Sequence, residues 1–271
     1  MLPVTSPSQV LEAINRVKTA APAFCTNLFA AEPKLRDWVA HGEFRAQEFE
    51  GAAFFARKDR DFSHLYFCAA QPDALARGLA RLPTIGSERL AADLVGPETS
   101  LTVLSSKMQP AGFRPYSRLV RLSRTANAAD PKETDRVELA GENDAPAILD
   151  LLEASFDRFA DQLPMRYEIQ AAIAQNQMLV VRQDSAIAAL LHFETQGFSS
   201  VLRFWMVAAP FRSTGFGSML MRHYFASQNR VRRFILWVTA ANENAVQKYS
   251  HYGYAPDGLV DQVLVNAMIA S

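Results

Sequence analysis

Cysteine is scarce in this 271-residue sequence, which contains only Cys25 and Cys68. Two cysteines are too few for the disulfide framework of a small secreted protein, and they are typical of a reducing compartment. An excess of charge of either sign is also missing, because 28 Lys and Arg residues balance 28 Asp and Glu residues. A neutral chain has no overall electrostatic attraction to nucleic acids or anionic membranes. We therefore expect neither as a partner, and we expect local groups to hold any anionic ligand.

Long apolar runs and clustered histidines are missing as well. The segment 186–193 is one of the longest apolar stretches and suits a buried strand, whereas a membrane-spanning helix needs about 20 apolar residues. The first residues lack a basic segment followed by an apolar one, so we expect no signal peptide and a cytoplasmic protein. His41, His64, His223 and His251 are scattered without metal-ligand spacing to a cysteine or an acid, and we expect no metal site.

The pattern of apolar residues divides the chain into two similar halves. A small and polar stretch over 125–135 is typical of a linker. In each half, strands and helices are expected in the same order, and the landmarks keep a near-constant offset: Gly253 lies 141 residues after Gly112, and Val207 lies 140 residues after Phe67. We infer a duplicated α/β unit. The strands expected in the first half include 49–57, 62–69 and 116–122, and those in the second half include 186–194, 200–207, 234–239 and 260–265.

The strongest local signal is a glycine-containing turn between an expected strand, 200–207, and an expected helix, 213–228. Gly215 and Gly217 allow unusual backbone dihedrals and close approach. The N–H groups of 212–218 would lie at the positive end of the helix dipole, which favours an anion. A phosphate loop of the Walker type is excluded because no lysine follows these glycines, and a Rossmann fingerprint is excluded because Leu220 replaces its third glycine. The alternative is a strand-to-helix turn without a ligand.

Two motifs in order resemble the GCN5-related N-acetyltransferase (GNAT) superfamily. Arg212, Gly215 and Gly217 match its acyl-CoA signature [RQ]-x-x-G-x-[GA]. Downstream, the segment 242–254 matches N-x-x-A-x-x-x-Y-x-x-x-G-[FY], with Tyr249 at the tyrosine position. The resemblance extends from about Val137 to the C-terminus, and the first half resembles only the fold.

The resemblance implies an α/β (α+β) chain of two tandem GNAT-like units, each a mixed, mostly antiparallel sheet flanked by helices. We expect a degenerate unit over 1–124, a linker over 125–135 and an acetyltransferase domain over 136–271. The stretch of the first half that corresponds to the phosphate turn, 68–73, has no glycine or arginine. Pro72 removes an N–H donor there and Asp73 would repel a phosphate, so this unit should not bind CoA.

The resemblance also implies the reaction, in which acetyl-CoA donates an acetyl group to a primary amine by direct attack in a ternary complex. An N–H of the strand end, most simply that of Val207, would polarise the thioester carbonyl. Tyr249 would protonate the leaving thiolate, and Asn242 would bond the cofactor arm or cap its helix. The expected cofactor-binding residues are Met206, Val207, Arg212, Ser213, Thr214, Gly215, Phe216, Gly217, Ser218 and Asn242.

The base that deprotonates the amine is less sharply indicated. Glu194 and His192 stand two apart on one expected strand and share a face, and Glu194 is the candidate base. The alternative is an exposed carboxylate at a strand end. Two other functions stay open: an O-acyltransferase on the same fold, and a catalytically silent CoA-binding module. The acceptor amine is not identified, and a homodimer is one arrangement left open.

Overall fold

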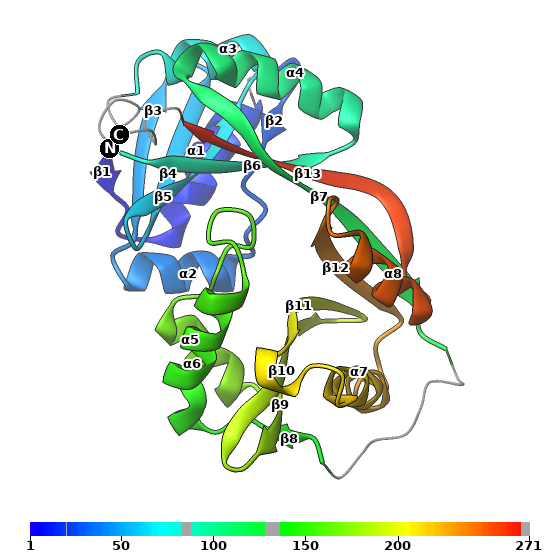
Figure 1. Ribbon diagram of the computed structural model, residues 1–271. Coiled ribbons are helices and arrows are strands. Elements are labelled where there is room, and N and C mark those ends of the chain that lie inside the picture. Colours follow the sequence, from blue (N-terminus) through cyan, green and yellow to red (C-terminus); the bar gives the residue numbers. More distant parts are fainter. Residues whose placement is uncertain (20, 83–87, 128–135, 267–271) are drawn as a thin grey trace. The chain divides into compact units, whose positions relative to one another are not determined.

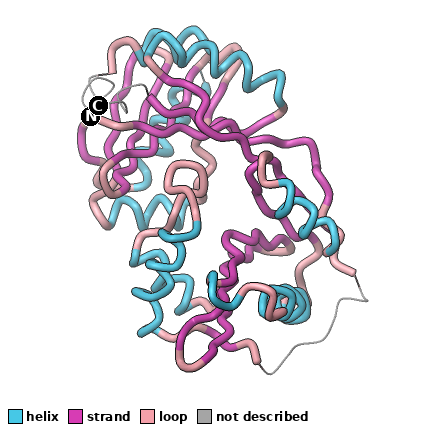
Figure 2. Tube along the Cα trace, in the orientation of Figure 1, coloured by secondary structure: helices cyan, strands magenta, loops and turns pink. Residues whose placement is uncertain are grey.

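A computed structural model describes residues 1–19, 21–82, 88–127 and 136–266 (Figure 1). The chain divides into two units. Unit 1 consists of Met1–Leu119 and Leu259–Ser271, and unit 2 consists of Val120–Gly258. Both contain helices and strands (Figure 2). Within the described residues, no helix has the length and apolar character needed to cross a membrane.

Unit 1 is a mixed sheet with helices on it. The parallel pair is β5–β6, and the pairs β1–β3, β3–β4, β4–β5 and β6–β13 are antiparallel. Val10, Ala13 and Val17 recur at helical spacing and bury one face of α1 in the same cluster as Trp38 and Phe55. The elements are β1 (Leu2–Pro3), α1 (Pro7–Thr19), β2 (Cys25–Thr26), α2 (Glu32–Ala40), β3 (Phe44–Phe49), β4 (Ala52–Asp59), β5 (Phe62–Ala69), α3 (Pro72–Leu79), β6 (Leu90–Gly96), α4 (Glu98–Met108), η2 (Gln109–Ala111) and the start of β7 (Phe113–Thr125).

Unit 2 repeats this order of elements. Its strands follow the order β7-β12-β11-β10-β9-β8, and β11–β12 is the parallel pair. One apolar cluster packs α7 on the sheet, with Leu220 and Tyr224 against Leu202 and Phe234. A second cluster packs α5 and α6 on Val180 and Phe204. The elements are β8 (Glu138–Leu139), η3 (Glu142–Asp144), α5 (Ala145–Ser155), α6 (Arg166–Ala174), β9 (Met178–Gln183), β10 (Ala186–Gln196), β11 (Ser199–Val207), η4 (Ala209–Phe211), α7 (Phe216–Ser227), β12 (Arg233–Thr239), α8 (Glu243–His251) and the start of β13 (Ala255–Asn266).

Each unit contains one strand from the other half of the sequence. In unit 1, the strand next to β6 is β13, from the end of the chain, with Val260 opposite Gly96 and Val265 opposite Ala91. In unit 2, the strand next to β12 is β7, from the first half. The expected boundaries at 124 and 136 therefore differ from the division into units. Of the expected linker, residues 128–135 lie outside the described residues, and Ala126 donates a backbone hydrogen bond to Arg232.

One expected strand of the first half is wrong. The sequence predicts a single strand over 49–57, whereas the structure has β3 and β4, which pair antiparallel with Phe49 opposite Ala52. Gly51, with φ of +75°, makes the tight turn between them. The sequence pattern does not indicate the hairpin, because β3 carries several partly exposed polar residues and lacks the apolar run of β4.

Candidate active site

The parallel strands β11 and β12 separate part-way along their length. Their paired positions run from Ser199–Arg233 to Leu202–Leu236, but β11 continues to Val207 and β12 to Thr239. A β-bulge lies at the same point, because His192 of β10 pairs with Phe204 while Phe193 pairs with Leu202. Arg203 is the extra residue of the bulge. The edge of β11 beyond Leu202 thus faces an opening between two neighbouring strands.

The backbone of β11 directs specific N–H groups toward this opening. The N–H of Ala208 donates to the carbonyl of Ala188, on β10, at 2.9 Å. Directions alternate along a strand in an antiparallel pair, so the N–H groups of Met206 and Phe204 also point toward β10. Those of Val207 and Trp205 point to the other side, where β12 has separated.

The opening ends at the turn before α7. Ser213 and Gly215 have positive φ angles of +69° and +85°. The first helical hydrogen bond of α7 runs from the N–H of Met219 to the carbonyl of Gly215 at 3.0 Å. The N–H groups of 216–218 therefore precede the hydrogen-bond ladder of the helix and have no partner within it. Residues 212–215 and Ser218 are exposed, whereas Phe216 and Gly217 are buried. The helix starts at Phe216, three residues later than the sequence suggests.

Close packing of α7 on β11 requires the second glycine. A Cβ on Gly217 would lie 3.2 Å from side-chain atoms of Trp205 and of Val207. The indole Nε1 of Trp205 donates to the carbonyl of Gly217 at 3.1 Å. The turn is thereby held against the strand whose edge faces the opening.

Helix α8 contributes the motif tyrosine. Asn242 caps this helix, because its Oδ1 accepts the N–H of Ala245 at 3.1 Å. The Tyr249 ring lies 5.4 Å from that of Trp205, between centroids. Burial raises the pKa of the Tyr249 phenol above its usual value, and the negative charge of Asp161 raises it further. The phenol is therefore protonated at neutral pH.

The two base candidates named from the sequence lie on β10. Glu194 forms an ion pair with Arg203, with Oε1 to Nε at 3.6 Å, and its side chain is 45% exposed. His192 is buried, and its ring lies 5.9 Å from the Phe204 ring. Glu194 therefore stands near the bulge in a largely solvated position.

Sequence reasoning missed Asp161, in the loop between α5 and α6. Its Oδ2 accepts the N–H of Asp157 at 2.8 Å. Burial raises the pKa of Asp161 to about 6. The hydrogen bond from the backbone N–H of Asp157 lowers this pKa, the side-chain charge of Asp157 raises it, and the charge of Arg203 lowers it. The sequence offers only an aspartate in this segment, because its burial depends on tertiary packing. No cluster of three or more His, Cys, Asp or Glu residues suited to a metal occurs in the parts of the chain described above.

Unit 1 has a corresponding opening, and the chain itself occupies it. The parallel pairing of β5 with β6 covers only Ser63–Leu90 and His64–Ala91, although β5 continues to Ala69. Beyond it, β2 pairs antiparallel with β5, with Cys25 opposite Ala69, on the edge away from β4. The next residue after β2, Asn27, accepts the N–H of Phe67 at 2.7 Å and donates to the carbonyl of Leu65 at 3.0 Å.

Comparison with known proteins agrees with this geometry. The model of the Acetyltransferase (GNAT) family matches residues 145–254. None of the curated proteins matches the chain. Among solved structures, a tandem GNAT protein from the clavulanic acid biosynthesis pathway has a TM-score of 0.58 at 11% identity, with 97% of each chain covered.

Two bacterial structures are similar in the same way. A GCN5-related N-acetyltransferase from Sphaerobacter thermophilus has a TM-score of 0.57 at 14% identity, over 98% of this chain and 94% of the other. A putative GNAT-family acetyltransferase from Novosphingobium aromaticivorans has a TM-score of 0.57 at 18% identity, over 82% and 92%. At these identities the likeness shows the fold. Together, the comparisons show a match to the Acetyltransferase (GNAT) family at residues 145–254 and a fold for the chain like that of a tandem GNAT protein.

Proposed function

We propose that unit 2 transfers an acetyl group from acetyl-CoA to a primary amine by direct attack in a ternary complex. The observation that carries this proposal is the opening between β11 and β12, which ends at the exposed turn before α7. A strand edge with N–H groups at 205 and 207 suits an extended amide-containing arm. A turn with N–H groups ahead of a helix suits a diphosphate.

In this proposal, different residues bind different parts of acetyl-CoA. The pyrophosphate lies on the turn formed by 212–218, and Arg212 adds a positive charge. The pantetheine arm runs along β11 at Met206 and Val207. The Oδ1 of Asn242 is used by its helix cap, which leaves its amide N–H groups for the arm. The cofactor is a cosubstrate, and the proposal contains no metal.

The chemistry follows from two groups in unit 2. The N–H of Val207 points into the opening and would stabilise the oxyanion of the tetrahedral intermediate. Tyr249 would give its proton to the CoA thiolate as the C–S bond breaks. Glu194 is the candidate base that the sequence names; its carboxylate pairs with Arg203 and is 45% exposed.

We also propose that unit 1 does not bind CoA. The segment from β2 to Asn27 occupies the edge of β5 that a pantetheine arm would need. At the start of α3, Pro72 has no N–H, and Asp73 brings a negative charge that pairs with Lys107 at 2.6 Å. Unit 1 would thus have a structural role in the chain.

Calorimetry with CoA tests both proposals at once. We expect one CoA per chain and a Kd that rises about tenfold or more in Gly215→Asp, because the aspartate strains a positive-φ position and repels the phosphates. Gly42→Asp is the matched control, since Gly42 also has a positive φ and open space around it. Two CoA molecules per chain would contradict the role of unit 1, and an unchanged Kd in Gly215→Asp would contradict the site.

Turnover is tested by thiol release from acetyl-CoA with spermidine, tyramine, an aminoglycoside, a peptide with a free N-terminus and a hydroxyl acceptor. Release with an amine supports the proposal. Release with the hydroxyl acceptor alone would favour an O-acyltransferase. CoA binding without release from any acceptor would favour a silent CoA-binding module.

A further inference from the structure

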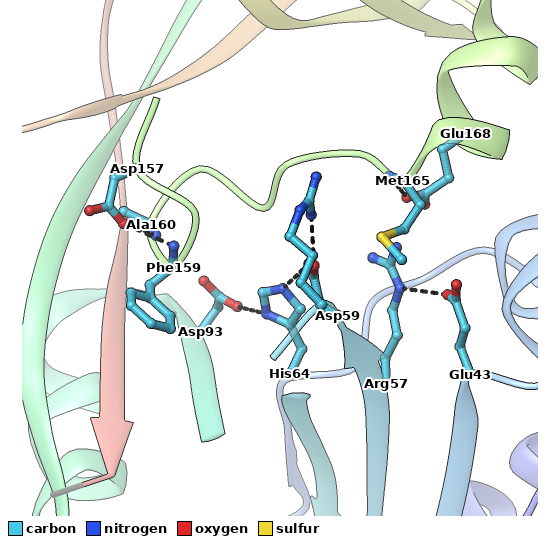
Figure 3. A network of polar contacts seen from close by, with 11 residues as sticks. Glu43, Arg57, Asp59, His64, Asp93, Asp157, Phe159, Ala160, Met165 and Glu168 are labelled. Atoms are coloured by element: carbon cyan, nitrogen blue, oxygen red, sulfur yellow. Dashed lines mark hydrogen bonds and ion pairs between the residues drawn. The ribbon is translucent and has the colours of Figure 1, made fainter. Parts of the chain in front are cut away.

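The α5–α6 loop holds the partly buried carboxylate of Asp161 in a fixed orientation, and Asp157 organises this loop. Asp157 Oδ1 accepts the N–H groups of Phe159 and Ala160, each at 2.9 Å (Figure 3). The loop closes through two more bonds between its ends, from the N–H of Asp161 to the carbonyl of Asp157 and from the N–H of Asp157 to Asp161 Oδ2, both at 2.8 Å. Asp161 Oδ1 accepts no hydrogen bond from the described part of the chain. The loop thus fixes one carboxylate oxygen and leaves the other for a ligand.

Two charged groups of unit 2 act on the Asp161 carboxylate, and the carboxylate acts on a third group. Asp157, on the same loop, repels it. Arg203, on β11, attracts it. Tyr249, on α8, is affected in turn by the charge of Asp161. The α5–α6 loop also packs on β11, because the Phe156 ring lies 5.0 Å from the ring of Phe204, the neighbour of the bulge residue Arg203. The loop that carries Asp161 therefore lies against the strand whose edge faces the opening.

We propose that Asp161 is the base that takes the proton from the acceptor ammonium. The inference rests on the proposed function and extends it to a residue that the sequence did not nominate. The acceptor R–NH3⁺ gives one proton to the Asp161 carboxylate, and the resulting amine attacks the thioester carbonyl carbon. The C–N bond forms, the C–S bond breaks, and Tyr249 protonates the thiolate. The acceptor nitrogen loses a second proton as the amide forms, and this proton goes to the Tyr249 phenolate. Asp161 then releases its proton to water.

The electrostatic link makes the acid and the base act in sequence. While Asp161 is charged, it raises the pKa of Tyr249 and holds the phenol proton. Once Asp161 has accepted the substrate proton, that charge is gone and Tyr249 becomes a better acid at the moment when the thiolate leaves. A carboxyl group with a pKa of about 6 is ionised at neutral pH and is a stronger base than an ordinary aspartate.

The first test is Asp161→Asn, with acetyl-CoA and the best amine of the panel above. We expect kcat to fall by about 10²- to 10³-fold, and the acidic limb of kcat/KM near pH 6 to disappear, while the Kd for CoA measured by calorimetry is unchanged. Glu194→Gln is the comparison, because Glu194 is the base that the sequence names. Its acidic limb should stay in place.

Two further variants should shift the acidic limb of the pH profile of kcat/KM without removing the Asp161 carboxylate. Asp157→Asn keeps an oxygen for the N–H groups of Phe159 and Ala160 but removes a negative charge, so the limb should shift to lower pH. Arg203→Gln removes a positive charge and should shift it to higher pH. A loop with only a structural role would not produce opposite shifts from these two changes.

The outcomes distinguish a failure of the role of Asp161 from a failure of the proposed acetyltransferase function. If the wild-type chain turns over and Asp161→Asn keeps its rate and its acidic limb, the role of Asp161 is refuted while the proposed function stands. If the limb disappears in Glu194→Gln instead, Glu194 is the base. If the wild-type chain binds CoA but releases no thiol with any amine, the proposed function fails and the role of Asp161 falls with it.

Discussion

Gly215 and Gly217 stand two positions apart and meet different physical needs. Gly215 has a positive φ with open space around it, so its requirement is conformational. Gly217 lies too close to Trp205 and Val207 to accept a side chain without displacing one of them. Both residues could be singled out from the sequence by spacing alone. Asp161 could not, because one aspartate in a loop looks like any other until burial and neighbours set its pKa.

Replacing Tyr249 by phenylalanine tests the acid at the residue scale. We expect kcat to fall by about 10²-fold, because the change removes the proton and keeps the ring that packs on Trp205. The Kd for CoA should be unchanged in calorimetry. Tyr252→Phe is the control, since Tyr252 packs edge-on against the same indole at 5.9 Å. Equal turnover in Tyr249→Phe and the wild-type chain would remove Tyr249 from the mechanism.

The short strand β2 and the long strand β13 show what periodicity leaves undetected at the scale of elements. Strand β2 has two residues, too few for a pattern, yet it pairs with the open edge of β5. Strand β13 was expected over 260–265 and is longer, from Ala255 to Asn266. Its Asp261 is buried with no hydrogen bond to Oδ1 from the described residues, and β6, its partner strand, contributes Asp93. Asp93 in turn lies near His64, with Oδ2 to Nδ1 at 3.8 Å (Figure 3).

The raised pKa of Asp261 leads to a prediction of how the stability of unit 1 depends on pH. Burial first, and then the charge of Asp93, raise the pKa of Asp261 well above its usual value. The folded state therefore keeps a proton that the unfolded state releases above about pH 4, so this residue lowers the free energy of unfolding as the pH rises. Asp261→Asn should be more stable than the wild-type chain at pH 7 by about 1 kcal/mol or more, with the gain vanishing toward pH 4.

Chemical denaturation at several pH values measures this difference. Asp61→Asn is the matched control, because the Asp61 side chain is 56% exposed and its ion pair with Arg89 lies at the surface. That variant should stay within about 0.5 kcal/mol of the wild-type chain. A gain for Asp261→Asn that is equal at pH 4 and pH 7 would contradict the proton balance.

At the scale of the whole molecule, each unit is completed by a strand from the other half of the sequence. β13 pairs with β6, although Val260 and its partner Gly96 are 164 residues apart, and β7 pairs with β12. The family match covers residues 145–254 and thus ends before β13 begins. The fold of unit 1 therefore depends on residues that follow the matched domain.

Deleting residues 259–271 tests this exchange of strands. We expect amide hydrogen exchange to accelerate in β6, because the deletion removes its partner strand, while β9 and β10 of unit 2 keep their protection as the internal control. Hydrogen exchange followed by mass spectrometry gives both signals from one sample. If β6 keeps its protection and unit 2 loses it, residues 259–271 stabilise the second half of the chain and not β6, which would contradict the exchange of strands.

The sequence by itself determined the features that depend on local chemistry: the glycine turn before α7, the cap and tyrosine of α8, and the repeated order of strands and helices. These follow from backbone conformation and apolar spacing over a few residues. Only the tertiary structure decided which strand closes each sheet, what occupies the edge of β5 and which carboxylate of the α5–α6 loop is partly buried. Pairing partners and the local dielectric arise from residues far apart in the chain, and no short-range pattern encodes them.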